Sequence, residues 1–240
     1  MSRPRPDGSS IPSSATWVVV TWLWAMAGPL LLAGAVVGLW GIDLQTARQW
    51  WERHQYAQAY VETVFVGLLP LALTVWRGDA FGDYGVRRRG FLASLSLSLA
   101  LAAAFRVYAF ATTGVWFGHS DLPFVAFPLN VWYGVLGIAA NGPLEVFFVF
   151  WLIRRTERLF ADGDLRWSKG LLVTILLVGL VHVISTRSVP NALTVAVLFL
   201  ALGLIYERTG NALGPMVGWT LMNGMTWAYV GLLCGRGVAA

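Results

Sequence analysis

Long apolar runs recur along almost the whole chain, and they limit it to a fold that can place most of its length in hydrocarbon. Of the 240 residues, 57% are hydrophobic and 12% are charged, whereas soluble domains carry about 25% charged residues. Crossing a bilayer takes roughly 20 apolar residues. Runs of about that length cover residues 15–40, 59–76, 91–113, 129–153, 171–186, 191–206 and 214–234. The sequence therefore predicts an all-α, polytopic membrane helix bundle of about seven transmembrane helices.

The segments outside these runs are short. Residues 43–58 are amphipathic, with Trp50 and Trp51 beside charged side chains, which predicts one interfacial helix on the outer membrane surface. The first run is longer than the roughly 7–15 apolar residues of a signal peptide. It is predicted to remain as an anchor behind a disordered cytoplasmic head, residues 1–14. Residues 15–240 are then expected to form a single transmembrane domain.

The Lys and Arg residues fall mainly in alternate loops, and this sets the expected orientation. With the N-terminus in the cytoplasm, the inside segments are residues 1–14, 77–90, 154–170 and 207–213. They hold 12 Lys and Arg residues, against 4 in the outside segments. Cytoplasmic loops of membrane proteins carry such an excess. The sequence predicts an integral protein of the cell membrane with its N-terminus cytoplasmic and its C-terminus outside, and no nucleic-acid partner.

Glu145 is the acid that most needs an explanation, because it lies inside the apolar run 129–153. A carboxylate in hydrocarbon is costly unless it is paired, protonated or functional. Counted at about 1.5 Å per residue from the cytoplasmic ends of their runs, Glu145, His182 and Asn223 lie about 12, 17 and 14 Å deep. They are predicted to converge on a cavity open to the cytoplasmic side. For His182 or Asn223 alone, a cross-helix hydrogen bond without catalytic meaning is the alternative.

Two further features concern the spans: a second, deeper polar layer, whose Arg106 lies about 10 Å from the depth of Glu145, and a proline beside Glu145. Glu62 and Arg106 lie about 21 and 22 Å deep by the same rise, which favours a structural ion pair between the second and third runs. Pro143 lacks an amide donor and disfavours helix at the residue before it. The fourth run is therefore predicted to be kinked or restarted there, with Asn141 as cap and Glu145 in the first turn, where the helix dipole stabilises a carboxylate.

Several short motifs follow one another in an order that resembles a known family. D-Y-G-V-R-R-R-G occupies residues 83–90, G-P-L-E residues 142–145, G-L-V-H residues 179–182, and Y-E-R-T-G-N residues 206–211, just before the seventh run. Over roughly residues 80–225 the chain resembles the CPBP family, the CAAX-processing and bacteriocin-processing intramembrane proteases that are often labelled abortive-infection proteins. The resemblance implies a helical membrane fold and peptide-bond hydrolysis inside the membrane.

The resemblance also implies roles for individual residues. In such enzymes the first Glu of an E-E-x-x-x-R motif activates water, while His and Asn side chains on later helices orient groups and stabilise the oxyanion. Glu145, His182 and Asn223 stand at matching positions and are the expected catalytic residues.

Three polar family positions are occupied differently here, and Val178 stands where the second motif usually has Phe. The second Glu and the Arg of the first motif are replaced by Val146 and Phe150, and the His of the third motif is replaced by Trp219. Trp offers one N–H donor and no base. Trp219 is predicted to fill the space of the missing imidazole and to pack against Glu145 and His182, so that Trp219, Pro143 and Phe150 shape the site.

Three functions are compatible with these observations. The first is an intramembrane endopeptidase that cleaves a membrane-anchored or prenylated peptide, with Glu145 as general base. No cofactor is expected with confidence, since one Glu, one His and one Asn make a weak zinc ligand set. The second is a catalytically inactive relative that binds a membrane peptide or lipid as a scaffold or regulator. The third is a small proton-coupled transporter, for which the chain lacks an internal repeat.

Overall fold

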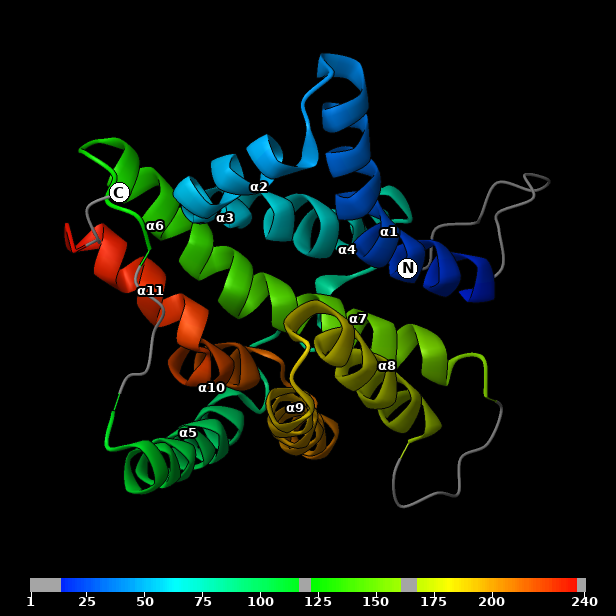
Figure 1. The fold of residues 1–240 in the computed structure, drawn as a ribbon. Helices are drawn as coiled ribbons and strands as arrows, with labels where there is room; N and C mark the ends of the chain where they lie inside the picture. The colour runs from blue at the N-terminus through cyan, green and yellow to red at the C-terminus, as the bar shows by residue number, and fades with distance from the viewer. Residues whose placement is uncertain (1–13, 117–121, 161–167, 237–240) are drawn as a thin grey trace.

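The computed structural model describes residues 14–116, 122–160 and 168–236, and this part is a bundle of helices. Six helical stretches in it are long and apolar enough to cross a membrane, in agreement with the predicted polytopic bundle. Four of them are single helices, namely α1 (Ser14–Trp40), α5 (Phe91–Thr113), α8 (Lys169–Thr186) and α9 (Val189–Thr209). Figure 1 shows α9 end-on beside α8. The expected disordered head lies outside the described residues, apart from Ser14.

The other two stretches are composite helices with a π-helical turn in the middle. The first joins α3 (Gln58–Glu62), η2 (Thr63–Leu68) and α4 (Leu69–Trp76), and the second joins α6 (Leu129–Ala139), η4 (Ala140–Leu144) and α7 (Glu145–Glu157). Each has a proline in or just after the π turn, Pro70 or Pro143. A proline clashes with the carbonyl four residues back, and a widened turn relieves the clash.

The prediction that the fourth run restarts at Asn141 is therefore wrong. The backbone stays helical from α6 to α7, and Asn141 donates from Nδ2 to the Gly137 carbonyl at 3.1 Å instead of capping a new helix. Glu145 follows a π turn inside one continuous stretch, so it does not lie at a free helix N-terminus.

The seventh predicted run is not one helix but two. It divides into α10 (Leu213–Met222) and α11 (Gly224–Leu233), and Asn223 between them has an extended backbone with φ −70° and ψ 123°. Helix α10 packs along α5, and α11 packs along α6 (Figure 1). This break brings the Asn223 side chain into the middle of the bundle.

The expected interfacial helix is present as α2 (Leu44–Arg53), and it is shorter than predicted. Asp43 caps it by accepting the Thr46 amide at 2.9 Å. None of its residues is buried, which fits a helix that lies against a membrane surface. A three-residue 3-10 turn, η1 (Gln55–Ala57), then leads into α3.

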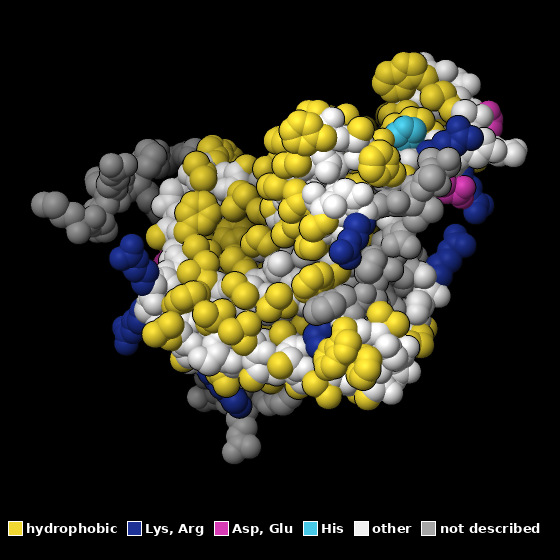
Figure 2. Space-filling model, turned by 90° about the vertical axis from the view of Figure 1, so that its left-hand side faces the viewer, with side chains coloured by type: hydrophobic (Ala, Val, Ile, Leu, Met, Phe, Trp, Pro, Cys, Tyr) yellow, Lys and Arg dark blue, Asp and Glu magenta, His cyan; other side chains and the backbone are white. Residues whose placement is uncertain are grey.

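Helix α7 occupies the centre of the bundle, and α1, α8 and α10 contact it. All eight residues from Val146 to Ile153 are buried. Many large hydrophobic side chains are also exposed on the outside of the bundle. Figure 2 shows one face that is mostly covered by hydrophobic side chains. An apolar core and an apolar outer face are typical of a bundle surrounded by lipid.

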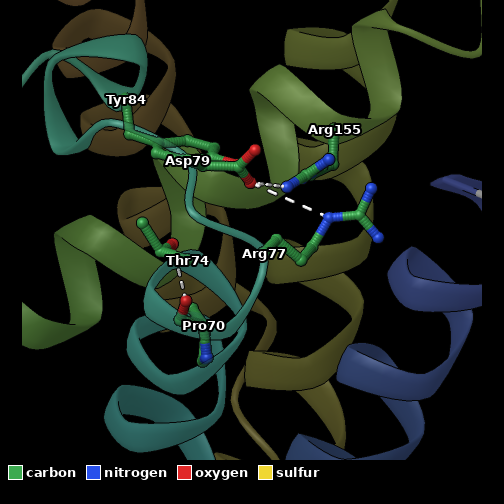
Figure 3. A network of polar contacts seen from close by, with 6 residues as sticks. All are labelled: Pro70, Thr74, Arg77, Asp79, Tyr84 and Arg155. Atoms are coloured by element: carbon green, nitrogen blue, oxygen red, sulfur yellow. Dashed lines mark hydrogen bonds and ion pairs between the residues drawn. The ribbon is translucent and has the colours of Figure 1, made fainter. Parts of the chain in front are cut away.

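The loops that were predicted to be cytoplasmic meet at one end of the bundle. Asp79 forms an ion pair with Arg155, whose side chain is 2% exposed, and accepts the Tyr84 hydroxyl at 2.9 Å (Figure 3). Tyr84 ends the short helix η3 (Phe81–Tyr84). Burial, together with the bond to Asp79, raises the pKa of Tyr84 to about 12, so the phenol remains a donor at neutral pH.

Two of the family-like motifs, D-Y-G-V-R-R-R-G and Y-E-R-T-G-N, also join here. Arg87 donates from Nε to the Gly210 carbonyl at 2.7 Å, and the Asn211 side chain donates to the backbone carbonyls of Arg87 and Arg89. The Ala212 amide donates to the Gly85 carbonyl at 2.8 Å. We call the assembly of residues 77–90, Arg154, Arg155 and residues 210–212 the clasp. It holds two loops and the C-terminal end of α7 on one side of the bundle, as the predicted alternation of the spans requires.

Candidate functional site

The Glu145 carboxylate is held by two neutral donors from the α10–α11 region. Trp219 donates from Nε1 to Oε2 at 2.7 Å, and Asn223 donates from Nδ2 to the same oxygen at 3.2 Å. No hydrogen bond to Oε1 is formed among the described residues. One carboxylate oxygen is therefore fixed, while the other remains available to a water or a substrate.

Asn223 uses its whole side chain in this arrangement. Its Oδ1 accepts the Met225 amide at 2.9 Å and so caps α11. Besides the bond to Glu145, Nδ2 donates to the Asn141 carbonyl at 2.8 Å. That carbonyl lies in the π-helical turn η4 and also accepts the Thr226 hydroxyl at 3.4 Å. The π turn and the helix break thus support each other through Asn223.

Trp219 stands at the position of the family's third-motif His. Its side chain is buried, and its ring packs against Phe199 with centroids 4.3 Å apart. Trp219 precedes Asn223 by one helical turn, so both residues approach Glu145 from the same side. The indole keeps a donor toward the carboxylate but cannot act as a base.

His182 lines the same cavity as Glu145 without bonding to it. Its Nδ1 lies 2.9 Å from the Val178 carbonyl on its own helix. A carbonyl can only accept, so Nδ1 carries the proton in the neutral ring and Nε2 has the free lone pair. His182 is therefore set up as a neutral acceptor beside the cavity.

Two cavities meet at these residues. A cavity of about 730 Å³, which we call the polar cavity, has a mixed lining in which polar side chains stand among apolar ones from α5, α9, α10 and α11. Its polar residues include Asn141, Thr186, Asn191 and Asn223. A second cavity of about 570 Å³ is mainly apolar and lies between α1, α3, α7 and α8, with Trp22 and Phe65 in its wall. Both are lined by a common seam of five residues, Gln58, Glu62, Glu145, His182 and Ser185.

The polar cavity extends toward one end of the bundle. Its lining continues to Ser185 and Thr186 at the end of α8 and to Asn191 at the start of α9. These residues lie at the end of α8 and α9 away from the clasp, while the buried residues Val146–Ile153 continue from Glu145 toward the clasp. The sequence placed both the clasp loops and the cavity opening on the cytoplasmic side, and the structure has them at opposite ends.

The predicted ion pair between Glu62 and Arg106 is not formed. Arg106 donates to the Leu221 carbonyl, from Nε at 2.9 Å and also from Nη2. The helix break leaves this carbonyl without its usual amide donor. In a continuous helix that donor would be the Met225 amide, which here donates to Asn223 Oδ1. A cation at the C-terminal end of α10 is favourable. Glu62 instead accepts from Gln58 Nε2 at 3.3 Å and lines both cavities.

The two remaining site-shaping residues have different places. Pro143 lies in η4, directly before the turn that carries Glu145. Phe150 is fully buried and stacks on Tyr206 with centroids 4.4 Å apart, and it lines neither cavity. Phe150, which stands where the family has Arg, therefore packs between α7 and α9 on the clasp side of Glu145.

The residues of the site do not fit a zinc ion. Within the described part of the chain, no group of three or more His, Cys, Asp or Glu side chains is arranged to hold a metal. Catalytic zinc usually has three protein ligands.

Gln58 and Ser185, which sequence reasoning passed over, line both cavities. A signal for them was available, since each lies three or four residues from Glu62 or His182 on the same helix face.

The helical bundle and its central carboxylate define a polytopic membrane protein with a glutamate-centred cavity. The model of the family described as type II CAAX prenyl endopeptidase Rce1-like matches residues 126–225. This segment runs from just before α6 to just past the helix break. The match confirms the resemblance that the motifs predicted, and the protein is CAAX protease-like in this region. No curated protein and no solved structure matches the chain.

Proposed function

We propose that the protein is an intramembrane endopeptidase that cleaves a membrane-anchored peptide, with Glu145 as the general base. The observation that carries this proposal is the asymmetric binding of the Glu145 carboxylate, in which Trp219 and Asn223 hold Oε2 and no described residue bonds to Oε1. A carboxylate fixed in this way at a cavity can take a proton from water without losing its position.

In the first step Oε1 of Glu145 takes one proton from a water in the polar cavity. The water oxygen forms a bond to the scissile carbonyl carbon, and the carbonyl oxygen becomes an oxyanion. His182 Nε2 accepts a hydrogen bond from the other hydrogen of the same water. This bond orients the water so that a lone pair of its oxygen points at the carbonyl carbon. Trp219 and Asn223 act as positioning residues, because the hydrogens that Asn223 carries on Nδ2 are already given to Asn141 and Glu145. The predicted oxyanion-donor role of Asn223 is therefore not part of this proposal.

The apolar cavity supports a substrate that arrives from the membrane. It is walled by α1 and α8 and reaches the seam that contains Glu145. An apolar anchor, such as a lipid-modified or hydrophobic segment, fits that wall, while the peptide bond extends into the polar cavity. The positive-inside pattern predicts a cytoplasmic clasp, and with that orientation the α8–α9 turn faces the outer leaflet.

The proposal is tested with the purified protein in liposomes and a panel of prenylated and unprenylated membrane peptides, with and without a chelator. Cleavage is expected for at least one anchored peptide and should be insensitive to the chelator. Glu145→Gln should abolish it and leave the unfolding midpoint unchanged. Glu52→Gln, the same change at an exposed site on α2, is the matched control.

Two results would contradict the proposal. Full cleavage by Glu145→Gln would exclude Glu145 as the base. If the wild-type protein cleaves no peptide of the panel but binds one of them, the chain is a non-catalytic relative.

A further inference from the structure

Hydrolysis of an amide needs a proton on the leaving nitrogen as well as a base for the water. The family pattern places a second Glu next to the first, and here that position is Val146, which is fully buried. The structure assigns a replacement from another helix: we propose that Glu62 is the second carboxyl group of the site and the acid that protonates the leaving nitrogen. This inference rests on the proposed function.

The backbone brings the two glutamates to one place. Glu62 directly precedes the π-helical turn η2, and Glu145 directly follows the π-helical turn η4. The two turns pack against each other, so closely that a Cβ on Gly67 would lie 2.8 Å from Leu144 Cδ1. π-Helical turns occur frequently at functional sites, and this pair places both acids on the seam between the two cavities.

The seam favours one shared proton. Among the described residues neither Glu62 nor Glu145 forms an ion pair, and their hydrogen-bond partners are the neutral groups of Gln58, Trp219 and Asn223. Two ionised carboxylates beside one poorly solvated cavity repel each other, and such pairs hold a single proton between them. The proposal therefore assigns one carboxylate, Glu145, and one carboxylic acid, Glu62, to the same cavity.

Other titratable or charged groups lie around the seam. His182 of α8 and Arg187, the residue after α8, line one or both cavities. Tyr229 comes from α11, and Arg106 of α5 is directed to the Leu221 carbonyl. The Tyr229 hydroxyl donates to the Tyr56 carbonyl at 3.2 Å. None of these groups forms an ion pair with Glu62.

The complete cycle then balances. Glu145 takes one proton from water, and the hydroxyl adds to the carbonyl carbon. Protonated Glu62 gives its proton to the amide nitrogen, the C–N bond breaks, and a carboxylic acid and an amine leave. Glu145 is now protonated and Glu62 ionised, so transfer of one proton from Glu145 to Glu62 through the cavity restores the starting state.

The test compares two substrates that differ only in the scissile bond, one an amide and the other an ester. An ester's alkoxide leaves with much less need of a proton than an amine does. Glu62→Gln is expected to lower kcat on the amide about 100-fold, with KM nearly unchanged, and to lower kcat on the ester less than about threefold. Glu62→Asp should recover part of the amide activity, and Glu52→Gln should match wild type on both.

Equal losses on amide and ester would show a structural role for Glu62 and overturn the proposal, as would full amide activity of Glu62→Gln. A second measurement does not need activity: the infrared C=O stretch of a protonated carboxyl at neutral pH. Glu62→Gln should remove this band, and Glu145→Gln should shift it. If wild type cleaves neither substrate but the band behaves in this way, the proposed function fails while the shared proton stands. A band unchanged by Glu62→Gln overturns the pairing.

Discussion

The clasp and the glutamate-centred cavity both bury charged groups, but they neutralise them in different ways. In the clasp the buried Arg155 meets an opposite charge, Asp79, and the loops around it are tied by backbone hydrogen bonds. At the cavity, Glu145 and Glu62 meet only neutral donors among the described residues. A paired charge stabilises a structure, whereas an unpaired carboxylate in a membrane is a cost that function can explain.

The motifs follow the same division. The clasp joins the two loop motifs, D-Y-G-V-R-R-R-G and Y-E-R-T-G-N, through Gly85, Arg87 and Asn211. At the cavity, Trp219, which donates to Glu145, stands where the family has His, and Glu62, from outside the matched segment, lines the wall. The clasp is thus tied by an ion pair and backbone hydrogen bonds, whereas the cavity gathers the candidate site residues. Changes in the clasp should therefore act on stability, and changes at the cavity on activity.

The largest effect on stability is expected from Asp79→Ala. It leaves Arg155, 2% exposed, without its counter-ion, and breaking a buried ion pair costs about 3–5 kcal/mol. Unfolding followed by circular dichroism in detergent measures the loss. Asp83→Ala removes the same charge from an exposed site in the same loop and should change stability by less than about 0.5 kcal/mol. Equal effects of the two substitutions would contradict the paired role of Asp79.

A smaller loss is expected from Gly85→Ala. Gly85 has φ +82°, and a Cβ there would lie 2.9 Å from the Ala212 amide nitrogen and 2.5 Å from the Tyr206 ring. The left-handed backbone alone costs a side chain about 1–2 kcal/mol, and the contacts add to this. Gly82→Ala is the control, since nothing lies within 4 Å of a Cβ at that position. A melting temperature that falls equally for both would contradict the specific requirement for glycine at position 85.

Much of the fold was predictable from the apolar runs, because spanning helices need length and hydrophobicity and little else. The break at Asn223 was hidden for the same reason: the run 214–234 is apolar throughout, and the turn-favouring pair Asn223–Gly224 lies inside it. What stabilises the break is distant in sequence, namely Arg106 on the Leu221 carbonyl and Asn223 on the Asn141 carbonyl.

The sequence predicted the depth of each site residue in the membrane, but not the side of its helix on which the side chain lies. Counting residues along the spans placed Glu145, His182 and Asn223 in one layer, and the structure has them around one cavity. The same counting matched Glu62 with Arg106, which point to different partners. Depth alone cannot distinguish two faces of a helix, and a π turn shifts the face further.

At the cavity, Asn223→Ala should separate the two functions of this residue. Loss of the α11 cap costs about 1 kcal/mol, and loss of the bonds to Asn141 and Glu145 adds about 1 kcal/mol. Asn223→Ser keeps a capping oxygen but is too short to reach Glu145. It should recover most of the stability in denaturation experiments and little of the peptide cleavage. Full cleavage by Asn223→Ser would mean that Trp219 alone positions Glu145.

The smallest effect is expected from Trp219→Phe. The ring against Phe199 is kept, and the single donor to Glu145 Oε2 is lost while the donor from Asn223 remains. A hydrogen bond of this kind is worth about 1 kcal/mol, which corresponds to roughly a fivefold fall in kcat/KM, with the unfolding midpoint nearly unchanged. Trp219→His places an N–H donor back at the position where the family has one, so its activity should exceed that of Trp219→Phe, at the cost of a gap beside Phe199. Both variants are compared with wild type on the same anchored peptide and by thermal unfolding. If Trp219→Phe cleaves as fast as wild type but unfolds at a lower temperature, the indole stabilises the fold and does not support cleavage. The rule that cavity residues act on activity and clasp residues on stability would then be wrong for Trp219.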